Sequence, residues 1–400
     1  MFGKHMNWQG STLFGDALRV NRKATHEDTR NQNRRFVLQC LFSTSPTTRA
    51  NIARATGLTR ATVSDLVSEL VHDGLVLELG TAPSKGGKPP TLLTVADDAY
   101  HVVTIRLSGS RWTGSVLTLR RRVIESFSVR STGRRGSPAI DALYDLIARL
   151  LASTRQRVLG IGIATPGVVT PDGTVVEATA LDWHGIAVGE LVSDRFSLPT
   201  HVINDASAIA LAEYSLGGHG TDNLFVVKIG TGVGAGIILD GRPYAGEGSA
   251  AGEIGHMAVL STFSDEDAAT TLEDVTSAHA IAERLDFDDP GDLDAVSVFR
   301  EVARRVAAGD AEALRAVERA GRYLGITMAS VTGILDLHHI VVTGPVTQLG
   351  DGFLLPAREE LSRRVLPAVA PRVDISFGSL DRPEEHGAAM SVLRREMGIL

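Results

Sequence analysis

Residues 48–74 carry the pattern that restricts the fold of this chain most. Thr48 opens a short amphipathic segment, and Gly57 follows at the position where a helix takes a left-handed exit. Thr59 is a good N-cap for the segment that follows. The apolar face of that second segment is continuous and consists of Val63, Leu66, Val67, Leu70 and Val71. A short helix, a glycine turn and a second helix predict a helix-turn-helix.

The flanking segments extend this pattern to a complete domain. Residues 31–42 are dense in apolar side chains and predict a buried first helix. Residues 75–95 predict two strands joined by a tip of Gly, Pro and Lys, which is typical of a wing. We therefore expect a winged helix-turn-helix domain over residues 31–95, preceded by a flexible arm over residues 1–30.

The residue types in this head favour contact with double-stranded DNA. The second helix begins with small polar residues and an arginine, as reading of base edges in a major groove requires. The wing tip places two lysines beside two glycines, so its backbone can lie close to phosphates or to a minor groove. The candidate DNA contacts are Thr59, Arg60, Thr62, Ser64, Lys85, Gly86, Gly87 and Lys88. The alternative is a three-helix interaction domain with a solvated hairpin.

The charge distribution fits a polyanionic partner for the head. Residues 1–95 hold 12 Lys and Arg against 7 Asp and Glu, a net charge of +5. The rest of the chain holds 28 against 40, a net charge of −12, so a basic head is joined to an acidic body. A charge of +5 is also compatible with a merely solvated surface.

Length and cysteine content narrow the class of protein. A chain of 400 residues is long enough for two or three domains, and its 43% hydrophobic residues are typical of globular proteins. Cys40 is the one cysteine, which excludes an intramolecular disulfide and a metal site built from several thiolates. No apolar run is long enough to span a bilayer, and residues 1–10 lack the apolar stretch of a signal peptide. These features predict a cytoplasmic protein without membrane contact.

From Tyr100 onward the pattern indicates an α/β body of two lobes. Each half begins with a predicted meander of short strands that leads into helices, and Asp240-Gly241 is the hairpin turn of the second meander. This indicates a duplicated architecture. We expect a first lobe over residues 96–205 and a second lobe over residues 206–385. Predicted helices cover residues 139–153, 270–285, 294–308, 310–335 and 386–398, the last of which packs on the first lobe.

Several polar side chains stand where predicted strands end. Asn204 and Asp205 follow a strand and open a helix, a position at which Asp205 could equally be an N-cap. Glu253, His256 and Glu273 come later in the chain. Carboxylate, amide and imidazole groups held in a cleft satisfy sugar hydroxyls, because each hydroxyl both donates and accepts a hydrogen bond. A lone His256 would more often be structural.

The glycine-rich segment 230–236, GTGVGAG, has two interpretations. Its backbone amides could approach an anion, as in a phosphate loop. Glycine also relieves crowding in a tight hairpin, and without a partner motif this second interpretation is favoured.

Taken together, the motifs resemble the ROK family, which comprises repressors and sugar kinases. The resemblance covers residues 31–398 and rests on SKGGKPPTLL, GIGIATPGVV, NDASAIALAE, KIGTGVGAGIILDG, AAGEIGHMAV and IVVTGP. It implies a body with the actin/hexokinase fold, whose two lobes close over a sugar. Family kinases lack the winged helix and family regulators carry it, so the head groups this chain with the regulators.

The resemblance also assigns roles to the polar residues. Asn204, Asp205, Glu253, His256 and Glu273 match the sugar-contacting positions of the family, and Asp205 matches the general base of its kinases. The kinases begin the body with D-x-G-G-T, where this chain has Arg106 in place of the acid. An aspartate there helps to organise magnesium and the phosphates of ATP, so the guanidinium argues against phosphoryl transfer.

Two further departures concern metal and sugar. Many family members bind zinc through the histidine of G-H and three cysteines of C-x-C-G-x-x-G-C-x-E, whereas this chain reads STFSDEDAATTLED, with Thr271 in the last cysteine's place. We therefore expect no metal at His256. Ala180 stands where the family often has an asparagine near the sugar, which leaves the identity of the effector open.

The function predicted from the sequence is a sugar-responsive DNA-binding regulator of carbohydrate metabolism, a repressor rather than an enzyme. It would need no cofactor and act as a homodimer or homotetramer on an operator. One alternative is an active ROK sugar kinase with an appended DNA-binding domain. Another keeps DNA binding but uses the body for oligomerisation and partner contacts alone.

Overall fold

The computed structural model describes residues 26–81, 89–109, 111–259, 270–287 and 294–399. The chain divides into two compact units, Met1–Val95 and Ala96–Leu400. We call the first unit the head and the second the body, and describe each by itself.

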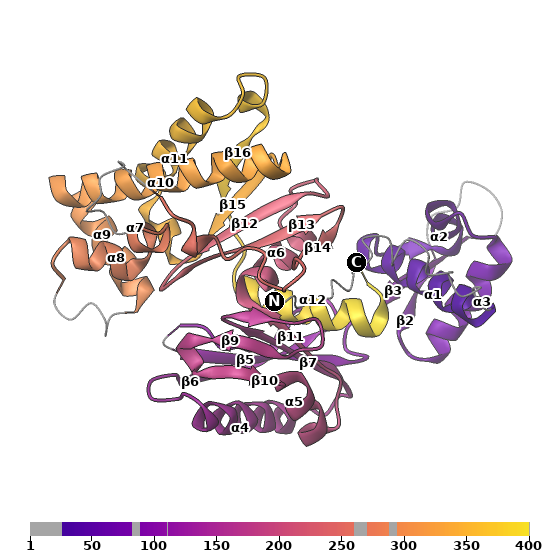
Figure 1. Ribbon diagram of the computed structural model, residues 1–400. Helices are drawn as coiled ribbons and strands as arrows, with labels where there is room; N and C mark the ends of the chain where they lie inside the picture. The colour runs from indigo at the N-terminus through magenta and orange to yellow at the C-terminus, as the bar shows by residue number, and fades with distance from the viewer. Residues whose placement is uncertain (1–25, 82–88, 110, 260–269, 288–293, 400) are drawn as a thin grey trace, which may run out of the picture. The chain divides into compact units, whose positions relative to one another are not determined.

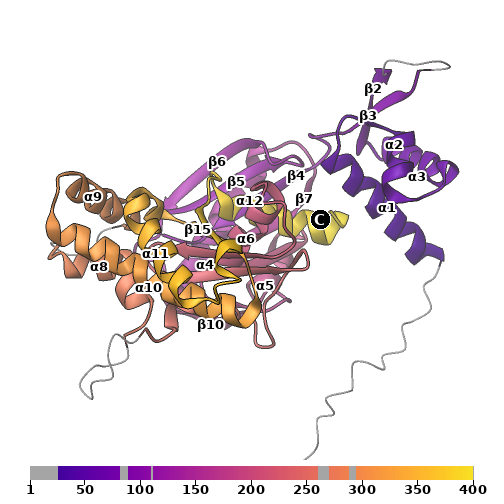
Figure 2. The ribbon, with the colours of Figure 1, turned by 90° about the horizontal axis from the view of Figure 1, so that it is seen from above.

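The head is a winged helix-turn-helix, as the sequence predicted. Thr48 accepts a hydrogen bond from the Asn51 amide, Gly57 has a φ of 70°, and Thr59 accepts from the Thr62 amide. Figure 2 shows strands β2 and β3 side by side as the wing. The short strand β1 pairs with β3 and was not predicted. The elements are α1 (His26–Ser43), β1 (Thr47–Thr48), α2 (Arg49–Thr56), α3 (Arg60–His72), β2 (Val76–Thr81) and β3 (Thr91–Val95).

Helix α1 begins at His26, inside the stretch 1–30 for which the sequence predicted an arm. Its first half is polar and gives no apolar periodicity. Two ion pairs tie this half to helix α3, one between Arg30 and Glu69 and one between Arg34 and Asp73. Contacts between residues far apart in sequence therefore extend the helix beyond its apolar part, which local periodicity cannot reveal.

The body contains two five-stranded sheets with the same topology (Figure 1). The first has the order β6-β5-β4-β7-β11 and the second β14-β13-β12-β15-β16. In each, the first three strands are antiparallel and the last two parallel to the central one. The predicted duplication is thus present as a repeated topology. The strands are β4 (His101–Arg106), β5 (Arg111–Thr118), β6 (Val123–Arg130), β7 (Val158–Thr165), β11 (Thr200–Asn204), β12 (Leu224–Ile229), β13 (Val233–Leu239), β14 (Arg242–Pro243), β15 (His339–Thr343) and β16 (Asp374–Phe377).

Helices cover the outer faces of these sheets and enclose two apolar cores (Figure 1). Those of the first lobe are α4 (Ser137–Ser153) and α5 (Val188–Phe196). Those of the second are α7 (Glu273–Thr276), α8 (Ala278–Arg284), α9 (Ala295–Ala307), α10 (Ala311–Leu335) and α11 (Asp351–Arg364). A small sheet of β8 (Val168–Val169), β9 (Val175–Ala178) and β10 (Trp183–Ile186) was not predicted, nor were α5 and α11.

Two helices lie between the sheets and join the lobes (Figure 1). Helix α6 (Asp205–Leu216) follows β11 and packs on β12 and β13, and helix α12 (Pro383–Val392) follows β16 and packs on β4 and β7. Each helix therefore crosses to the sheet of the other lobe. The closing helix begins at Pro383, three residues before the predicted start at 386. A π-helical turn, Leu393–Met397, continues it at its C-terminal end. Small residues allow α6 and α12 to approach closely, because a Cβ at Gly387 would overlap the Ala208 carbonyl.

We predict that Gly387→Ala separates the two crossing helices and lowers the free energy of unfolding by about 1–3 kcal/mol, since overpacking must be relieved by backbone movement. Gly333→Ala is the matched control. Gly333 also lies within a helix, but a Cβ there would meet nothing within 4 Å. That control should gain up to about 1 kcal/mol from helix propensity. Denaturant unfolding of both variants measures the difference, and equal effects would contradict the role of Gly387.

Candidate functional site

The predicted DNA contacts of helix α3 divide into two kinds. Thr59 and Thr62 bond to each other through their hydroxyls at 2.9 Å, and Thr59 also caps the helix, so both are occupied locally. Arg60 and Ser64 are exposed on the first turns of α3 and line a pocket of about 450 Å³. The other lining residues are Thr48, Arg49, Ala50, Pro89, Pro90 and Thr91. The pocket therefore lies between the start of helix α3, which is predicted to read DNA bases, and the start of helix α2.

Ion pairs within the head leave Arg60 available. Three arginines pair with head carboxylates: Arg30 with Glu69, Arg34 with Asp73, and Arg49 with Glu78 at 2.9 Å. Within the described part of the head, Arg60 has no carboxylate within 4 Å. The predicted wing contacts Lys85, Gly86, Gly87 and Lys88 lie outside the described residues.

In the body, Asn204 and Asp205 have different roles from those first considered. Asn204, not Asp205, is the N-cap of helix α6: its Oδ1 accepts from the Ser207 amide at 3.0 Å. Its Nδ2 donates to the Gly167 carbonyl, also at 3.0 Å, which ties the loop after β7 to the helix. Asp205 is the first residue of the helix, so its carboxylate is left for another partner.

That partner is Lys228 on strand β12, a residue that the sequence analysis missed. Its Nζ lies 2.5 Å from Oδ2 of Asp205 and 3.8 Å from Oε1 of Glu384 in the first turn of α12. Burial lowers the pKa of Lys228, but the charges of Asp205 and Glu384 outweigh this effect, so that its pKa is raised overall. Lys228 is therefore a charged ammonium between two carboxylates. The signal that could have found it is its rarity, since it is the one lysine after residue 95.

The charges of Asp205, His256 and Glu273 act on Glu253, and a Cβ at Gly255 would lie 3.2 Å from the Glu273 carboxylate. Burial raises the pKa of Glu253, the charge of His256 lowers it, and the charges of Asp205 and Glu273 raise it further. Glu253 precedes a short 3-10 turn and His256 ends it, both with exposed surface, while Glu273 starts helix α7. Four of the five predicted sugar contacts thus form one electrostatically coupled group. The fifth, Asn204, caps the helix that begins with Asp205.

The glycine-rich segment 230–236 forms a tight hairpin between β12 and β13. Gly232 lies against the Glu273 carboxylate, and a Cβ at Gly236 would overlap the backbone of helix α6. The Val233 amide donates to Oε2 of Glu273 at 2.7 Å, so a carboxylate occupies an amide that a phosphate loop would offer. The crowding interpretation is the one these contacts support.

Arg106 ends strand β4 and faces the same interlobe region. Its Nη2 lies 3.3 Å from Oγ1 of Thr113, and its positive charge lowers the pKa of Lys228 and of Glu385. Glu385 is 3% exposed, and burial raises its pKa despite a hydrogen bond from Ser115 and an ion pair with Arg382 at 3.4 Å. Within the described residues, the Arg106 guanidinium thus lies near the Lys228 ammonium and the buried Glu385 carboxylate.

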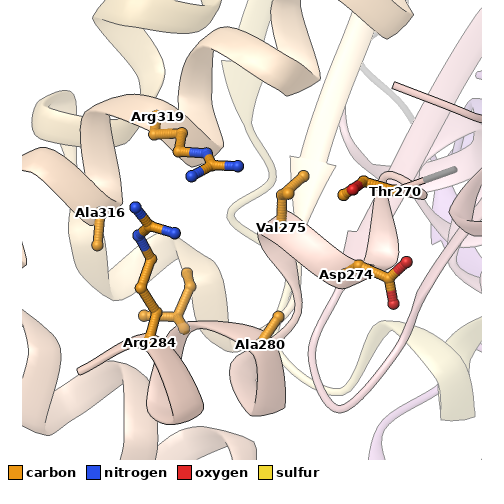
Figure 3. A pocket seen from close by; sticks show the side chains of 8 residues that line it. Thr270, Asp274, Val275, Ala280, Arg284, Ala316 and Arg319 are labelled. Atoms are coloured by element: carbon orange, nitrogen blue, oxygen red, sulfur yellow. The ribbon is translucent and has the colours of Figure 1, made fainter. Parts of the chain in front are cut away.

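A separate pocket of about 340 Å³ lies on the second lobe and is shown in Figure 3. The side chains of Arg284 and Arg319 come from α8 and α10, and Asp274 of α7 is another lining residue. Asp274 is held by the amide and hydroxyl of Thr271. None of the predicted sugar contacts lines this pocket, although Asp274 is the sequence neighbour of Glu273. This pocket and the cluster of predicted sugar contacts are therefore different places.

Within the described residues, no group of three His, Cys, Asp or Glu side chains is arranged to hold a metal ion. Part of the predicted former zinc stretch, residues 260–269, lies outside them. Among the described helices, none has the length and apolar composition needed to cross a membrane.

The geometry defines a class of protein: a winged helix-turn-helix head joined to a duplicated, two-lobed body of the sugar-kinase type. Comparison of sequences agrees with this class. The ROK family profile matches residues 102–382, and the IclR helix-turn-helix profile matches residues 37–79. The chain belongs to the ROK family.

Individual relatives and solved structures are similar over most of the chain. A protein of Caldicellulosiruptor sp. (strain Rt8B.4), named "Putative xylose repressor", is 30% identical over 83% of this chain and 87% of its own. The crystal structure of a ROK family transcriptional regulator, a homolog of the E. coli MLC protein, covers 92% of this chain and 96% of its own with 22% identity and a TM-score of 0.78. A ROK glucokinase from Streptomyces griseus in complex with glucose and AMPPNP covers 73% of this chain and 98% of its own, with 23% identity and a TM-score of 0.61.

We predict that the purified, tag-free protein contains no stoichiometric zinc, because the three cysteines of the family's zinc motif are replaced and Cys40 is in the head. Chelators should leave its melting temperature unchanged, since no folding free energy depends on metal. Elemental analysis and thermal unfolding with and without EDTA measure both quantities. About one zinc per chain would contradict the prediction.

Proposed function

We propose that this protein is a sugar-responsive DNA-binding repressor whose kinase-like body senses an effector and transfers no phosphoryl group. The observation that carries this proposal is the Lys228–Asp205 ion pair at 2.5 Å. A general base must be free to accept a proton from the substrate hydroxyl. Here Oδ2 of the matching carboxylate already accepts a hydrogen bond from the Lys228 ammonium, so it is not free to accept that proton.

The charges around the site favour an uncharged sugar as the effector. Asp205, Glu253 and Glu273 supply three carboxylates, and the cation that is hydrogen-bonded to one of them is Lys228. Arg106 acts on Lys228 and His256 on Glu253 through their charges. Hydroxyl groups can donate to these carboxylates, but a phosphate group would be repelled by them. The relative named a xylose repressor is consistent with a neutral monosaccharide.

The head and body would be coupled through an oligomer in the cytoplasm. Relatives named as repressors, together with a helix-turn-helix, support an operator as the DNA partner. Two heads of a homodimer or homotetramer would contact two half-sites of the operator. Closure of the lobes over a sugar would change the spacing and orientation of these two heads. We also propose that the two lobes have the boundaries expected from the sequence, residues 96–205 and residues 206–385.

An active sugar kinase is the second candidate, favoured by the likeness of the body to a glucokinase solved with glucose and AMPPNP. Two features of this chain oppose it. Arg106 stands at the end of β4, where the family's kinases have an acid for magnesium and phosphate, and Lys228 neutralises Asp205. The regulator is therefore the better-supported function.

We predict that Arg60→Ala weakens binding to an operator selected from random DNA by about 1–3 kcal/mol, because a bidentate contact to a base is lost. Arg35→Ala removes an equal charge from an exposed position of α1 and should weaken operator and random DNA equally. Neutralising Lys85 and Lys88 should likewise weaken both and flatten the salt dependence. Fluorescence anisotropy on both DNAs measures this, and equal losses for Arg60→Ala would refute base reading.

We predict that a neutral monosaccharide such as D-xylose or D-glucose releases the wild-type protein from its operator, and that Asp205→Asn weakens this response at least tenfold, because hydrogen bonds to a charged group are lost. The ligand-free operator affinity should stay nearly unchanged, since the head has its own core. Asp145→Asn, exposed on α4, is the control and should respond normally. Labelled ATP with each sugar should give no sugar phosphate.

These assays separate the candidate functions. Robust sugar phosphorylation by the wild type would establish the kinase. Operator binding with no sugar binding in calorimetry would leave a body used for oligomerisation and partner contacts. An unchanged sugar response in Asp205→Asn would remove Asp205 from the site.

A further inference from the structure

Lys228 is exceptional in the composition of the body. The chain carries 28 basic residues after position 95, of which 27 are arginine and one is Lys228. Each of the other 27 basic side chains of the body thus carries its charge on a planar, delocalised guanidinium. An ammonium is compact, has three donors in no fixed plane, and can change partners without matching a fork geometry. A single lysine among arginines, placed between two carboxylates, points to a role that needs an exchangeable partner.

The three charged groups come from the two helices that join the lobes and from the central strand of the second sheet. Lys228 is on β12 in the second sheet, Asp205 opens α6, and Glu384 lies in the first turn of α12. Both acids sit at helix N-termini, where the helix dipole favours negative charge. The structure is therefore built so that either carboxylate can hold the ammonium.

The distances show which partner holds it in this state. Nζ of Lys228 is hydrogen-bonded to Asp205 at 2.5 Å but is 3.8 Å from Oε1 of Glu384, within ion-pair range and beyond a hydrogen bond. All three side chains keep some exposure, 17% for Lys228, 11% for Asp205 and 13% for Glu384. A small ligand can thus reach the pair without unfolding it.

We propose that Lys228 is a switch residue that changes partner when the effector binds. Without effector it is bonded to Asp205. Effector hydroxyls take the Asp205 carboxylate, and Lys228 then forms its hydrogen bond with Glu384 at the start of helix α12. This inference rests on the proposed function, because it assumes that Asp205 receives the sugar.

The exchange gives sugar occupancy a direct effect on the lobe crossing. Helix α12 packs on the first-lobe strands β4 and β7 and crosses α6 at Gly387 and Ala208. When the Lys228 ammonium moves from the N-terminus of α6 to the N-terminus of α12, the contacts of both crossing helices change. The sugar therefore makes a differential interaction between two states, which any ligand-induced transition requires.

The test compares sugar binding with operator release in full-length Lys228→Met, Glu384→Gln and the control Glu190→Gln. Glu190 is an exposed acid in the first turn of α5 and has no basic partner within 4 Å among the described residues. Calorimetry with D-xylose and D-glucose measures occupancy, and anisotropy with the selected operator measures release at saturating sugar.

The expected results differ for each variant. The wild type should lose roughly 5–150-fold in operator affinity on saturation, the usual range of allosteric coupling. Lys228→Met should bind sugar yet lose this change almost completely. Glu384→Gln should bind sugar about tenfold more weakly, because the displaced ammonium lacks its second carboxylate. Glu190→Gln should match the wild type. A merely structural Lys228 would instead leave the coupling ratio intact.

A measurement on the wild type avoids dependence on variant folding. The chain has five lysines, Lys4, Lys23, Lys85, Lys88 and Lys228, so selective 13C labelling gives five Cε signals in NMR spectra. The Lys228 signal is identified by its loss in Lys228→Met. Sugar should move this signal in the wild type and move it less in Glu384→Gln.

The outcomes distinguish the switch from the proposed function. Normal operator release in Lys228→Met, or a Lys228 signal that sugar does not move in sugar-bound wild type, would overturn the switch while leaving the sensor in place. Failure of a broad panel of neutral monosaccharides to bind the wild type would overturn the proposed function and the switch together.

Discussion

The close crossing of helices α6 and α12 is the contact on which the body depends. Each helix follows the last strand of one lobe and packs on the sheet of the other, so each sheet is covered by the helix that starts from the other lobe. Alanine and glycine at the crossing bring the two backbones together, with Ala164, Ala208 and Ala388 forming one buried cluster. Because so little side-chain volume separates the helices, small displacements of one are felt by the other.

The candidate sugar site follows from this arrangement. The N-termini of the two helices lie on either side of Lys228, so Asp205 and Glu384 are placed by the crossing rather than by loops. In a kinase such a frame must leave one carboxylate free and accommodate a triphosphate. In this chain both carboxylates lie within ion-pair distance of Lys228, and the charges of Arg382 and Arg106 act on the neighbouring Glu385. The same frame is thus better suited to binding a hydroxyl-rich ligand than to transferring phosphate.

The sequence predicted those parts of the fold that local chemistry specifies. Thr48, Gly57 and Thr59 act through their own turns, and their caps and left-handed exit are as expected. Helix α1 starts earlier than predicted because ion pairs to α3 extend it, and two-residue strands such as β8 have too few residues for a periodicity. The site residues came from a resemblance and from polar residues at strand ends. Lys228 was missed because its proposed role depends on its ion pair with Glu384, which is far away in the sequence.

The paired state of Lys228 also limits how strongly a sugar can act. Effector hydroxyls must compete with an ammonium for Asp205, so part of the sugar's binding free energy is used to break that ion pair. Glu384 offsets this cost only as far as it restores a hydrogen bond to Lys228. The free energy available to shift the lobes is the difference between the sugar's affinities for the two pairings, typically about 1–3 kcal/mol for coupled sites. In this scheme the sugar reports its binding through the exchange of partners, whereas an unpaired Asp205 would bind sugar without any exchange to report.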